Sequence, residues 1–309
     1  MSTALSRARS SERVNRQNRL WLIGSLAPAV VILVVLSIYP VFNLVQLSLS
    51  FVSHEGGQAV TRYVGLQNFE ALFTSEPVYW VGVRNTILFS IFAVLGQMVL
   101  GFVMALAVRN ASGLGRGVLT AIFLLPIVIP PIVIGAMWRL MLGRDFGVVN
   151  TALGFVGLGP IDFLGDANFA LASVIVVDIW HWTPFVFLLM LAGLESLDDE
   201  VLQAARIDVV NRWQELRFIT VPLMLPTILV TLAFRLILSL KVFDEIYLLT
   251  GGGPGTSTEV INFSIYRVFF QQDRVGLGSA MSLLTLFAIA LLAILAQIWV
   301  RRRRRRAQA

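Results

Sequence analysis

The chain has 309 residues, of which 57% are hydrophobic and only 14% are charged. Soluble domains carry about 25% charged residues, so this composition excludes an ordinary soluble protein and indicates a membrane protein. The net charge of +6 does not indicate a nucleic-acid partner, because the arginines cluster at the ends of apolar runs. The absence of cysteine excludes disulfides and a thiol nucleophile.

Long apolar runs recur along the chain. A helix that crosses a bilayer needs roughly 20 apolar residues; four uncharged runs reach this length, and two further segments of suitable length contain a few charged residues. The sequence therefore predicts an all-α polytopic membrane protein with about six transmembrane helices. The expected spans cover residues 20–48, 82–108, 117–141, 169–193, 223–249 and 275–300.

The arginines predict the orientation of this transmembrane domain, which covers residues 20–300. Most of them lie in a basic tail at 1–19, in a basic tail at 301–309, between the second and third spans, and in a polar loop at 194–222. Because basic loops stay on the cytoplasmic side, both termini and the polar loop are predicted to be cytoplasmic. The run Arg301–Arg306 is interpreted as a lipid-anchoring flank of the last span.

Prolines inside the third and fourth spans predict local distortions. Pro126, Pro130 and Pro131 lie in the third span and Pro184 lies in the fourth. Since proline removes a backbone donor and clashes with the preceding turn, we expect kinks or freed carbonyls there. Such kinks suit a moving pathway but also occur in passive membrane helices.

The fourth and fifth spans contain the charged residues Asp178, Arg235, Lys241 and Asp244. A charge at the centre of a bilayer costs about 2.5–3.5 kcal/mol on insertion scales, so each needs a local reason. One interpretation is that they line a solute pathway. The other is that they pair with one another, Asp178 with Lys241, or Lys241 with Glu245 one turn later.

Four aromatic residues lie near these charges, namely Trp180, His181, Trp182 and Tyr247. Their rings combine apolar faces with polar edges, which suits contact with a sugar ring. Packing between helices, or a belt at the membrane interface, is the alternative for each of them.

The polar loop between the fourth and fifth spans has two helix-start signals. Ser196 followed by Asp199 is typical of a capping box, and Asn211 with Gln214 repeats the pattern. The loop therefore predicts two short helices, the second ended by Pro222 and Pro226. A connection between spans does not need this detail, so we expect a partner that binds the loop.

The chain lacks the residues of a nucleotide site. Its only lysine, Lys241, has no glycine nearby, whereas a P-loop places lysine directly after a glycine-rich turn. The glycines at 251–255 are interpreted as a turn, and two histidines far apart in the sequence do not predict a metal site. We expect no enzyme activity and no bound cofactor. If a nucleotide energises transport through this protein, its hydrolysis would occur on another polypeptide.

The polar loop carries a family motif. Residues 203–208 read Gln-Ala-Ala-Arg-Ile-Asp and residues 219–222 read Ile-Thr-Val-Pro. This pattern resembles the EAA loop of the membrane subunits of binding-protein-dependent ABC importers, in the maltose-type carbohydrate-uptake group. Further segments typical of that group follow one another across nearly the whole chain, at residues 64–69, 85–86, 243–247, 249–254 and 276–280.

The loop departs from the family pattern at two places. Gln203 replaces the first glutamate and cannot form its ion pair, and Val209 with Val210 replaces a Gly-Ala pair. Glycine adopts positive φ without cost, whereas a β-branched residue does not. The bend therefore either uses ordinary dihedral angles or is strained by about 1–3 kcal/mol.

The resemblance implies a type I ABC importer permease fold in a prokaryotic cell membrane. A second permease subunit, normally a different chain, would complete the pathway, two ATPase subunits would bind ATP and Mg, and an extracytoplasmic binding protein would deliver a sugar or sugar-like solute. The resemblance assigns ATPase coupling to Val201, Leu202, Gln203, Ala204, Ala205 and Asp208. The candidates for the solute pathway are Asp178, Trp180, His181, Trp182, Ser239, Lys241, Asp244 and Tyr247.

Three other interpretations remain open from the sequence. Ala204 and Ala205 would also suit packing against the ends of this chain's own helices. An ion-gradient-driven secondary transporter would show matching halves with broken helices, and no such halves are evident. A membrane scaffold would not need charged and aromatic groups inside two spans.

Overall fold

The computed structural model describes residues 2–55, 58–198, 200 and 211–307. The chain divides into two compact units. The first combines Met1–Phe73 with Val268–Ala309, and the second is Thr74–Arg267. Among the described residues, the strands form one two-stranded sheet, and helices make up most of the rest.

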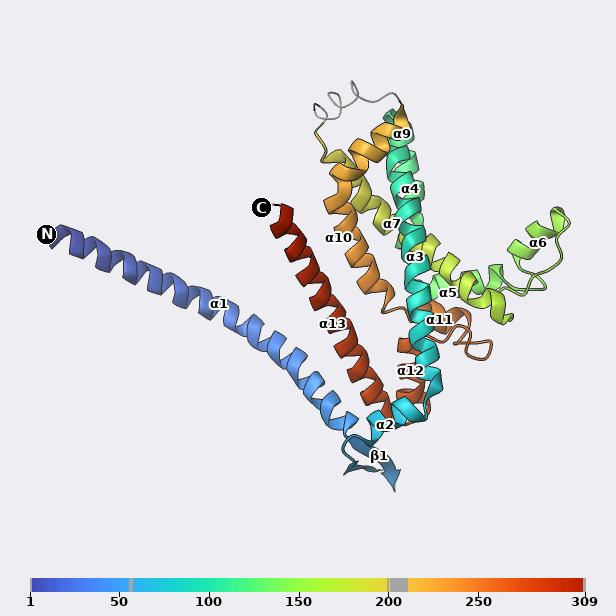
Figure 1. Ribbon diagram of the computed structural model, residues 1–309, viewed down its shortest axis with the longest axis horizontal. Helices are drawn as coiled ribbons and strands as arrows, with labels where there is room; N and C mark the ends of the chain where they lie inside the picture. The colour runs from blue at the N-terminus through green and yellow to red at the C-terminus, as the bar shows by residue number, and fades with distance from the viewer. Residues whose placement is uncertain (1, 56–57, 199, 201–210, 308–309) are drawn as a thin grey trace. The chain divides into compact units, whose positions relative to one another are not determined.

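The first unit consists of two long helices and a β-hairpin (Figure 1). Helix α13 packs against α1 and against β1, and the strands pair antiparallel with Ser50 opposite Tyr63. The hairpin was not predicted from the sequence, and both long helices continue into the basic tails. The elements are α1 (Ser2–Ser48), β1 (Ser50–Glu55), β2 (Gln58–Tyr63), α2 (Gln67–Thr74), the π-helix η2 (Arg267–Gln271), which begins at the boundary with the second unit, and α13 (Val275–Ala307).

Two of the segments typical of the family, at 64–69 and 276–280, meet the hairpin through close backbone contacts. Asn68 donates through Nδ2 to the carbonyls of Ser48 and Ser50, both at 2.9 Å. A Cβ atom on Gly276 would overlap the Ser50 carbonyl oxygen. Only glycine therefore lets the first turn of α13 approach the hairpin this closely.

The second unit is built around α3 (Pro77–Asn110) and α7 (Ala167–Glu195), which make the most extensive contact among the described helices. Small residues allow the approach: a Cβ atom on Gly101 of α3 would lie 2.9 Å from the backbone nitrogen of Phe187. The other elements of the unit are α4 (Gly113–Val128), α5 (Pro131–Met141), α6 (Val148–Phe155), α9 (Arg212–Glu215), the π-helix η1 (Leu216–Thr220), α10 (Val221–Ser239), α11 (Asp244–Leu249) and α12 (Ile261–Tyr266).

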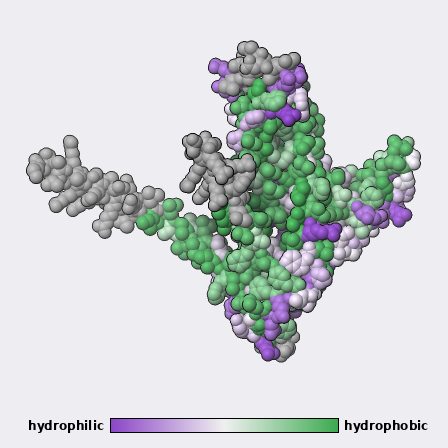
Figure 2. All heavy atoms as spheres, viewed as in Figure 1, coloured by the Kyte–Doolittle hydropathy of each residue, from purple (hydrophilic) through white to green (hydrophobic). Residues whose placement is uncertain are grey.

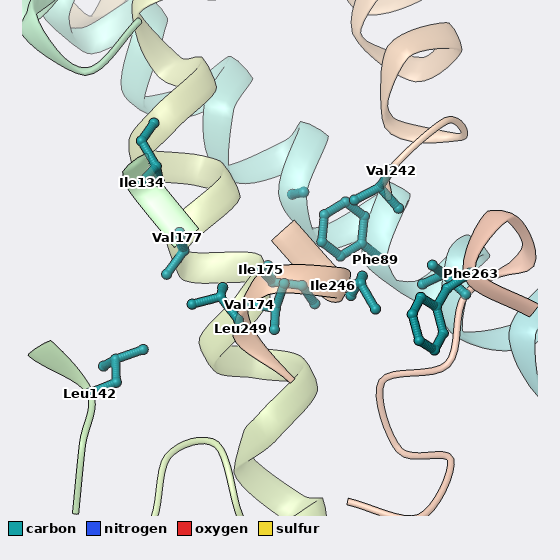
Figure 3. Close-up of a cluster of buried hydrophobic side chains, with 12 residues drawn as sticks. Phe89, Ile134, Leu142, Val174, Ile175, Val177, Val242, Ile246, Leu249 and Phe263 are labelled. Carbon is teal, nitrogen blue, oxygen red and sulfur yellow. The ribbon is translucent and has the colours of Figure 1, made fainter. Parts of the chain in front are cut away.

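A buried apolar cluster joins α3, α5, α7, α11 and α12 (Figure 3). Phe89 of α3, Val174 of α7 and Ile246 of α11 are fully buried within it. Burial of one such side chain is worth about 1.5–3 kcal/mol. The cluster therefore fixes α11, a helix of 6 residues, which could not hold its position alone.

The predicted third span is bent rather than straight. Helices α4 and α5 meet at 95° across a short break. Ile129 and Pro130 each precede a proline, which disfavours the α region, and their ψ angles of 127° and 141° are extended. The prediction of a kink is confirmed, and the prolines are its cause. Pro184, in contrast, lies inside a continuous α7.

The structure departs from the predicted fifth span at both of its ends. Helix α10 stops at Ser239, and residues 240–243 separate it from α11. At the other end Pro222 does not terminate a helix, because the wide turn of η1 at Leu216–Thr220 leads directly into α10. Proline is tolerated in the first turn of a helix, where its missing N–H has no partner to lose.

Five described helices are long and apolar enough to cross a membrane, or six if the bent pair counts as one span. In the second unit, hydrophobic side chains cover the flanks of these helices and hydrophilic ones gather near α9 (Figure 2). The prediction of about six spans is therefore consistent with the fold, with the bent pair in the third place.

Candidate functional site

A chain of buried polar groups crosses the centre of the second unit. Gln97 of α3 donates through Nε2 to Asp178 Oδ2 of α7 at 2.7 Å, and its Oε1 accepts from Arg235 Nε of α10 at 2.7 Å. Arg235 Nη2 lies 3.5 Å from Asp178 Oδ2. All three side chains are at most 3% exposed. One amide thus connects an acid and a base that belong to two other helices.

The guanidinium of Arg235 has a second partner. Its Cζ lies 4.9 Å from the ring centroid of Trp182, a distance typical of a cation–π contact. A buried charge is stable only when it is paired and hydrogen-bonded. Asp178, Gln97 and Trp182 together meet this requirement.

A second polar pair attaches α11 to α7. His181 Nδ1 lies 3.3 Å from Glu245 Oε1, and both residues are at most 8% exposed. Because a break separates α11 from α10, the backbone alone does not fix the position of α11. The His181–Glu245 pair attaches α11 to α7 instead. Asp178 and His181 lie one turn apart on α7, so the two pairs are neighbours.

Neither pairing that the sequence left open for Lys241 is formed. Asp178 pairs with Arg235 and Glu245 pairs with His181, whereas Lys241 is exposed in the break between α10 and α11. Within the part of the chain that the structure describes, Lys241 makes no ion pair. The two pairings suggested for Lys241 were therefore wrong, although Asp178 does pair with another of the charged residues. Residues 240–243 are not helical, so Lys241 does not share a helix face with Glu245.

The remaining pathway candidates fall into two groups. Ser239 is buried and donates to the Leu236 carbonyl at 3.0 Å, so its hydroxyl has a hydrogen-bond partner within α10. Asp244 is exposed, and Tyr247 is 45% exposed. Lys241, Asp244 and Tyr247 are therefore accessible, whereas Ser239, Asp178 and His181 are buried.

Tyr247 belongs to an aromatic cluster on α11 and α12. Its ring stacks on Phe243, with centroids 5.5 Å apart and planes at 15°, and meets Tyr266 edge to face at 5.6 Å. Trp180 instead packs edge to face on Trp138 of α5 at 5.5 Å and contacts the apolar core. Helix packing thus accounts for Trp180, whereas Tyr247 presents an accessible, rigid ring.

Two of the buried polar residues in these links were not singled out as site residues from the sequence. Gln97 is a neutral residue in an apolar run, and Glu245 entered only as a possible partner of Lys241. A polar side chain inside an otherwise apolar span is the signal that identifies Gln97, because an unpaired amide in lipid is costly.

The described ends of the polar loop test its helix-start signals. Asn211 Oδ1 accepts from the Gln214 backbone nitrogen at 2.9 Å, which confirms the second cap. Ser196 instead donates to the Gly193 carbonyl and ends α7, so it does not begin the next helix. Asp198 Oδ1 accepts from the Glu200 backbone nitrogen at 2.9 Å. The coupling candidates Val201, Leu202, Gln203, Ala204, Ala205 and Asp208 lie outside the described residues, as do Val209 and Val210.

The glycine-rich segment after α11 is a turn held on α3. Gly251, Gly252 and Gly255 have positive φ, which accounts for glycine at these positions. Asn85 donates to the carbonyls of Thr256 and Ser257, both at 3.1 Å. The segment is therefore fixed to α3 rather than free to act as a phosphate loop.

Beyond this turn lies a buried carboxylate. Glu259 is fully buried, accepts from Ser264 Oγ at 2.7 Å and pairs with Arg267 Nη2 at 3.1 Å. Burial raises the pKa of the Glu259 carboxyl above its ordinary value, although Ser264 and Arg267 oppose the shift.

Comparison with known proteins identifies the family to which the chain belongs. Residues 97–308 match the family described as the inner membrane component of binding-protein-dependent transport systems. The chain belongs to this family. The resemblance inferred from the polar loop is confirmed.

Relatives and a solved structure agree with this assignment. The chain is 37% identical over 223 residues to the trehalose/maltose transport system permease protein MalF of Thermococcus litoralis, covering 72% of this chain and 75% of the relative. It is 29% identical over 290 residues to the lactose transport system permease protein LacF of Rhizobium radiobacter, covering 92% and 94%. A bacterial alginate ABC transporter, solved with an alginate pentasaccharide-bound periplasmic protein, superposes with a TM-score of 0.80 at 26% identity, covering 92% of this chain and 96% of that one.

The protein is therefore a membrane-embedded permease subunit of an ABC-type importer, with the type I fold, in the inner membrane of a prokaryote. It is a transport component rather than an enzyme. The alternative of an ion-gradient-driven secondary transporter is wrong.

Proposed function

We propose that this subunit forms half of the translocation pathway for a sugar or sugar-like solute. The observation that carries the proposal is the pair of polar links, Gln97–Asp178–Arg235 and His181–Glu245, buried among apolar helices beside an accessible aromatic cluster. Charged groups inside membrane-spanning helices mark transport pathways more often than passive packing. The names of the relatives, which include trehalose, maltose and lactose systems, support a carbohydrate.

The two groups of candidate residues would have different tasks. Tyr247, stacked on Phe243, would offer its ring to the C–H face of a sugar. Lys241 and Asp244, exposed beside it, would bind hydroxyls. The buried Asp178, His181 and Ser239 would hold α7, α10 and α11 in position, with Trp182 covering Arg235. Trp180 would support them by packing against the core.

The driving force would come from partner subunits. Two ATPase subunits would bind ATP and Mg, and a second permease, normally a different chain, would complete the pathway. The segment Val201 to Asp208 would insert into a groove of one ATPase, where the small Ala204 and Ala205 permit close approach. Closure of the ATPases would then tip the helices between inward-facing and outward-facing states.

A binding protein on the outer side would deliver the solute. The structural relative solved with a periplasmic protein supports this partner. Asn85 would keep the turn at 251–255 rigid on α3 and so would maintain the outer face that such a protein meets.

Solute-stimulated ATP hydrolysis by the reconstituted complex tests the proposal. We expect stimulation by at least one neutral di- or oligosaccharide in a panel that also contains an acidic oligosaccharide and an amino acid. Tyr247→Ala should weaken the response to that sugar and should spare co-purification of the ATPase. Stimulation by the amino acid alone, or none in the presence of ATPase and binding protein, would contradict the carbohydrate assignment.

A further inference from the structure

Two arginines from separate helices line one cavity near the end of α3. The cavity has a volume of about 510 Å³, and Arg109 of α3 and Arg212 of α9 contribute to its wall. Glu215 lies in the same wall, so the formal charge of the described lining residues is positive. Leu106 and Leu216 provide apolar surface next to these charges.

The neighbouring surface has the composition of a membrane–water interface. Trp213 is 66% exposed and Phe218 is 65% exposed, and the Arg217 guanidinium lies 5.6 Å from the centroid of the Phe218 ring. Exposed aromatic rings beside arginines are typical of helix ends at the level of lipid headgroups. Hydrophilic side chains also gather around α9, next to the apolar flanks of the helices (Figure 2).

We propose that this cavity binds the phosphate of an anionic phospholipid from the cytoplasmic leaflet. The arginine side chains match phosphate oxygens in geometry and charge, and Leu106 with Leu216 would contact the glycerol and upper acyl region. Basic pockets between helices on the cytoplasmic side suit such headgroups. The inference rests on the proposed function for one point, namely that the end of α3 beside the polar loop faces the cytoplasm.

The site has a consequence for coupling. Arg212 follows directly after Asn211, whose side chain caps the helix that returns from the polar loop. A lipid held by Arg109 and Arg212 would therefore join the end of α3 to the start of this return helix. The efficiency with which ATP hydrolysis responds to solute would then depend on the lipid.

Lipid retention by the purified complex provides the direct test. The complex is delipidated in detergent, incubated with phosphatidylglycerol or phosphatidylcholine, and analysed by native mass spectrometry. We expect selective retention of phosphatidylglycerol and a loss of about fivefold in retention for each arginine removed, Arg109→Gln or Arg212→Gln. Arg84→Gln, which removes an exposed arginine near the opposite end of α3, is the matched control and should change retention by less than about twofold.

Two further experiments test the charge of the site and the chemical class of its ligand. Glu215→Gln removes the negative charge from the cavity and should raise retention, whereas a fall would contradict the charge argument. Inorganic phosphate at equal concentration should not displace the lipid, because it makes no contact with Leu106 and Leu216; displacement would assign the site to a free anion and overturn the lipid proposal.

The competing occupant is an acidic surface of an ATPase subunit. Asn110→Cys, the sole cysteine in the chain, carries a photoreactive label at the exposed edge of the cavity. Cross-linking to phosphatidylglycerol in preference to phosphatidylcholine supports the proposal, and cross-linking to the ATPase overturns it. Unchanged retention in the double variant Arg109→Gln/Arg212→Gln with normal solute-stimulated hydrolysis would reject the lipid site and leave the transport function intact.

Discussion

At the scale of single residues, the main polar feature inside the second unit is the ion pair between Asp178 and Arg235. Both groups are nearly inaccessible, so each charge depends on the other and on Gln97. Removing one partner of a buried pair costs about 3–5 kcal/mol, because the remaining charge is uncompensated, while removing both can be nearly neutral. The pair therefore specifies how α7 and α10 meet more than it adds to net stability.

Asp178→Leu should accordingly lower the thermal unfolding midpoint strongly, and Asp178→Leu/Arg235→Leu should recover much of the loss. Intrinsic tryptophan fluorescence of the purified protein in detergent measures the unfolding midpoint of both variants. Glu195→Leu is the control, because it breaks an exposed pair with Arg116 and should cost less than about 1 kcal/mol. Additive losses in the double variant would show that the two side chains do not depend on one another.

The buried Glu259 gives a prediction about pH. Its pKa is raised in the folded chain, so the folded state holds this proton more tightly than the unfolded state does. Stability from this group is therefore present at acidic pH and is lost as the pH rises through the raised pKa. Relative to Glu259→Gln, which cannot titrate, the wild type should gain thermal stability as the pH falls from neutral towards the ordinary range of a carboxyl group. A difference between the two proteins that does not change with pH would contradict the assignment.

Residue chemistry in the sequence predicted only part of this network. The cost of charge in a bilayer identified Asp178 and Arg235 as residues that need partners. The choice of partner depends on the rotation of α7 relative to α3 and α10, which no local pattern specifies. Lys241 illustrates the limit, since α10 ends at Ser239, before Lys241 is reached.

At the scale of helices, packing between α3 and α7 depends on glycine. Gly101→Ala would place a methyl group 2.9 Å from the Phe187 backbone nitrogen, so we expect a loss of about 1–3 kcal/mol from overpacking. A Cβ atom added to Gly117 of α4 would meet no atom within 4 Å, so Gly117→Ala should be neutral or stabilise by up to about 1 kcal/mol. Thermal unfolding of both variants checks the contrast. Equal effects would show that helix propensity alone acts at these sites.

The helices themselves were predictable to different degrees. Proline chemistry predicted the bend between α4 and α5, because two consecutive residues each precede a proline. The end of α10 at Ser239 was not predictable, since residues 240–249 contain neither glycine nor proline. The β-hairpin of the first unit was missed because its strands are short and mixed in polarity.

At the scale of the whole molecule, the chain is a transport subunit without a nucleotide site of the P-loop kind. The family assignment makes it a permease of an ABC-type importer, and the sequence contains no glycine-rich turn followed by lysine. We therefore propose that energy enters through contact with another subunit. The sequence motif at 203–208 is the candidate for that contact, and the fold does not bear on it, since this segment lies outside the described residues.

Solute-stimulated ATP hydrolysis by the assembled complex carrying Ala205→Arg tests this claim most directly. A bulky charged side chain at the proposed contact should reduce stimulation to background, while membrane insertion remains normal. Ser112→Arg, at an exposed position in the loop between α3 and α4 where the side chain makes no capping hydrogen bond, should leave stimulation intact. Full stimulation in Ala205→Arg would contradict the account, because the ATPases would then drive transport without contact at this segment.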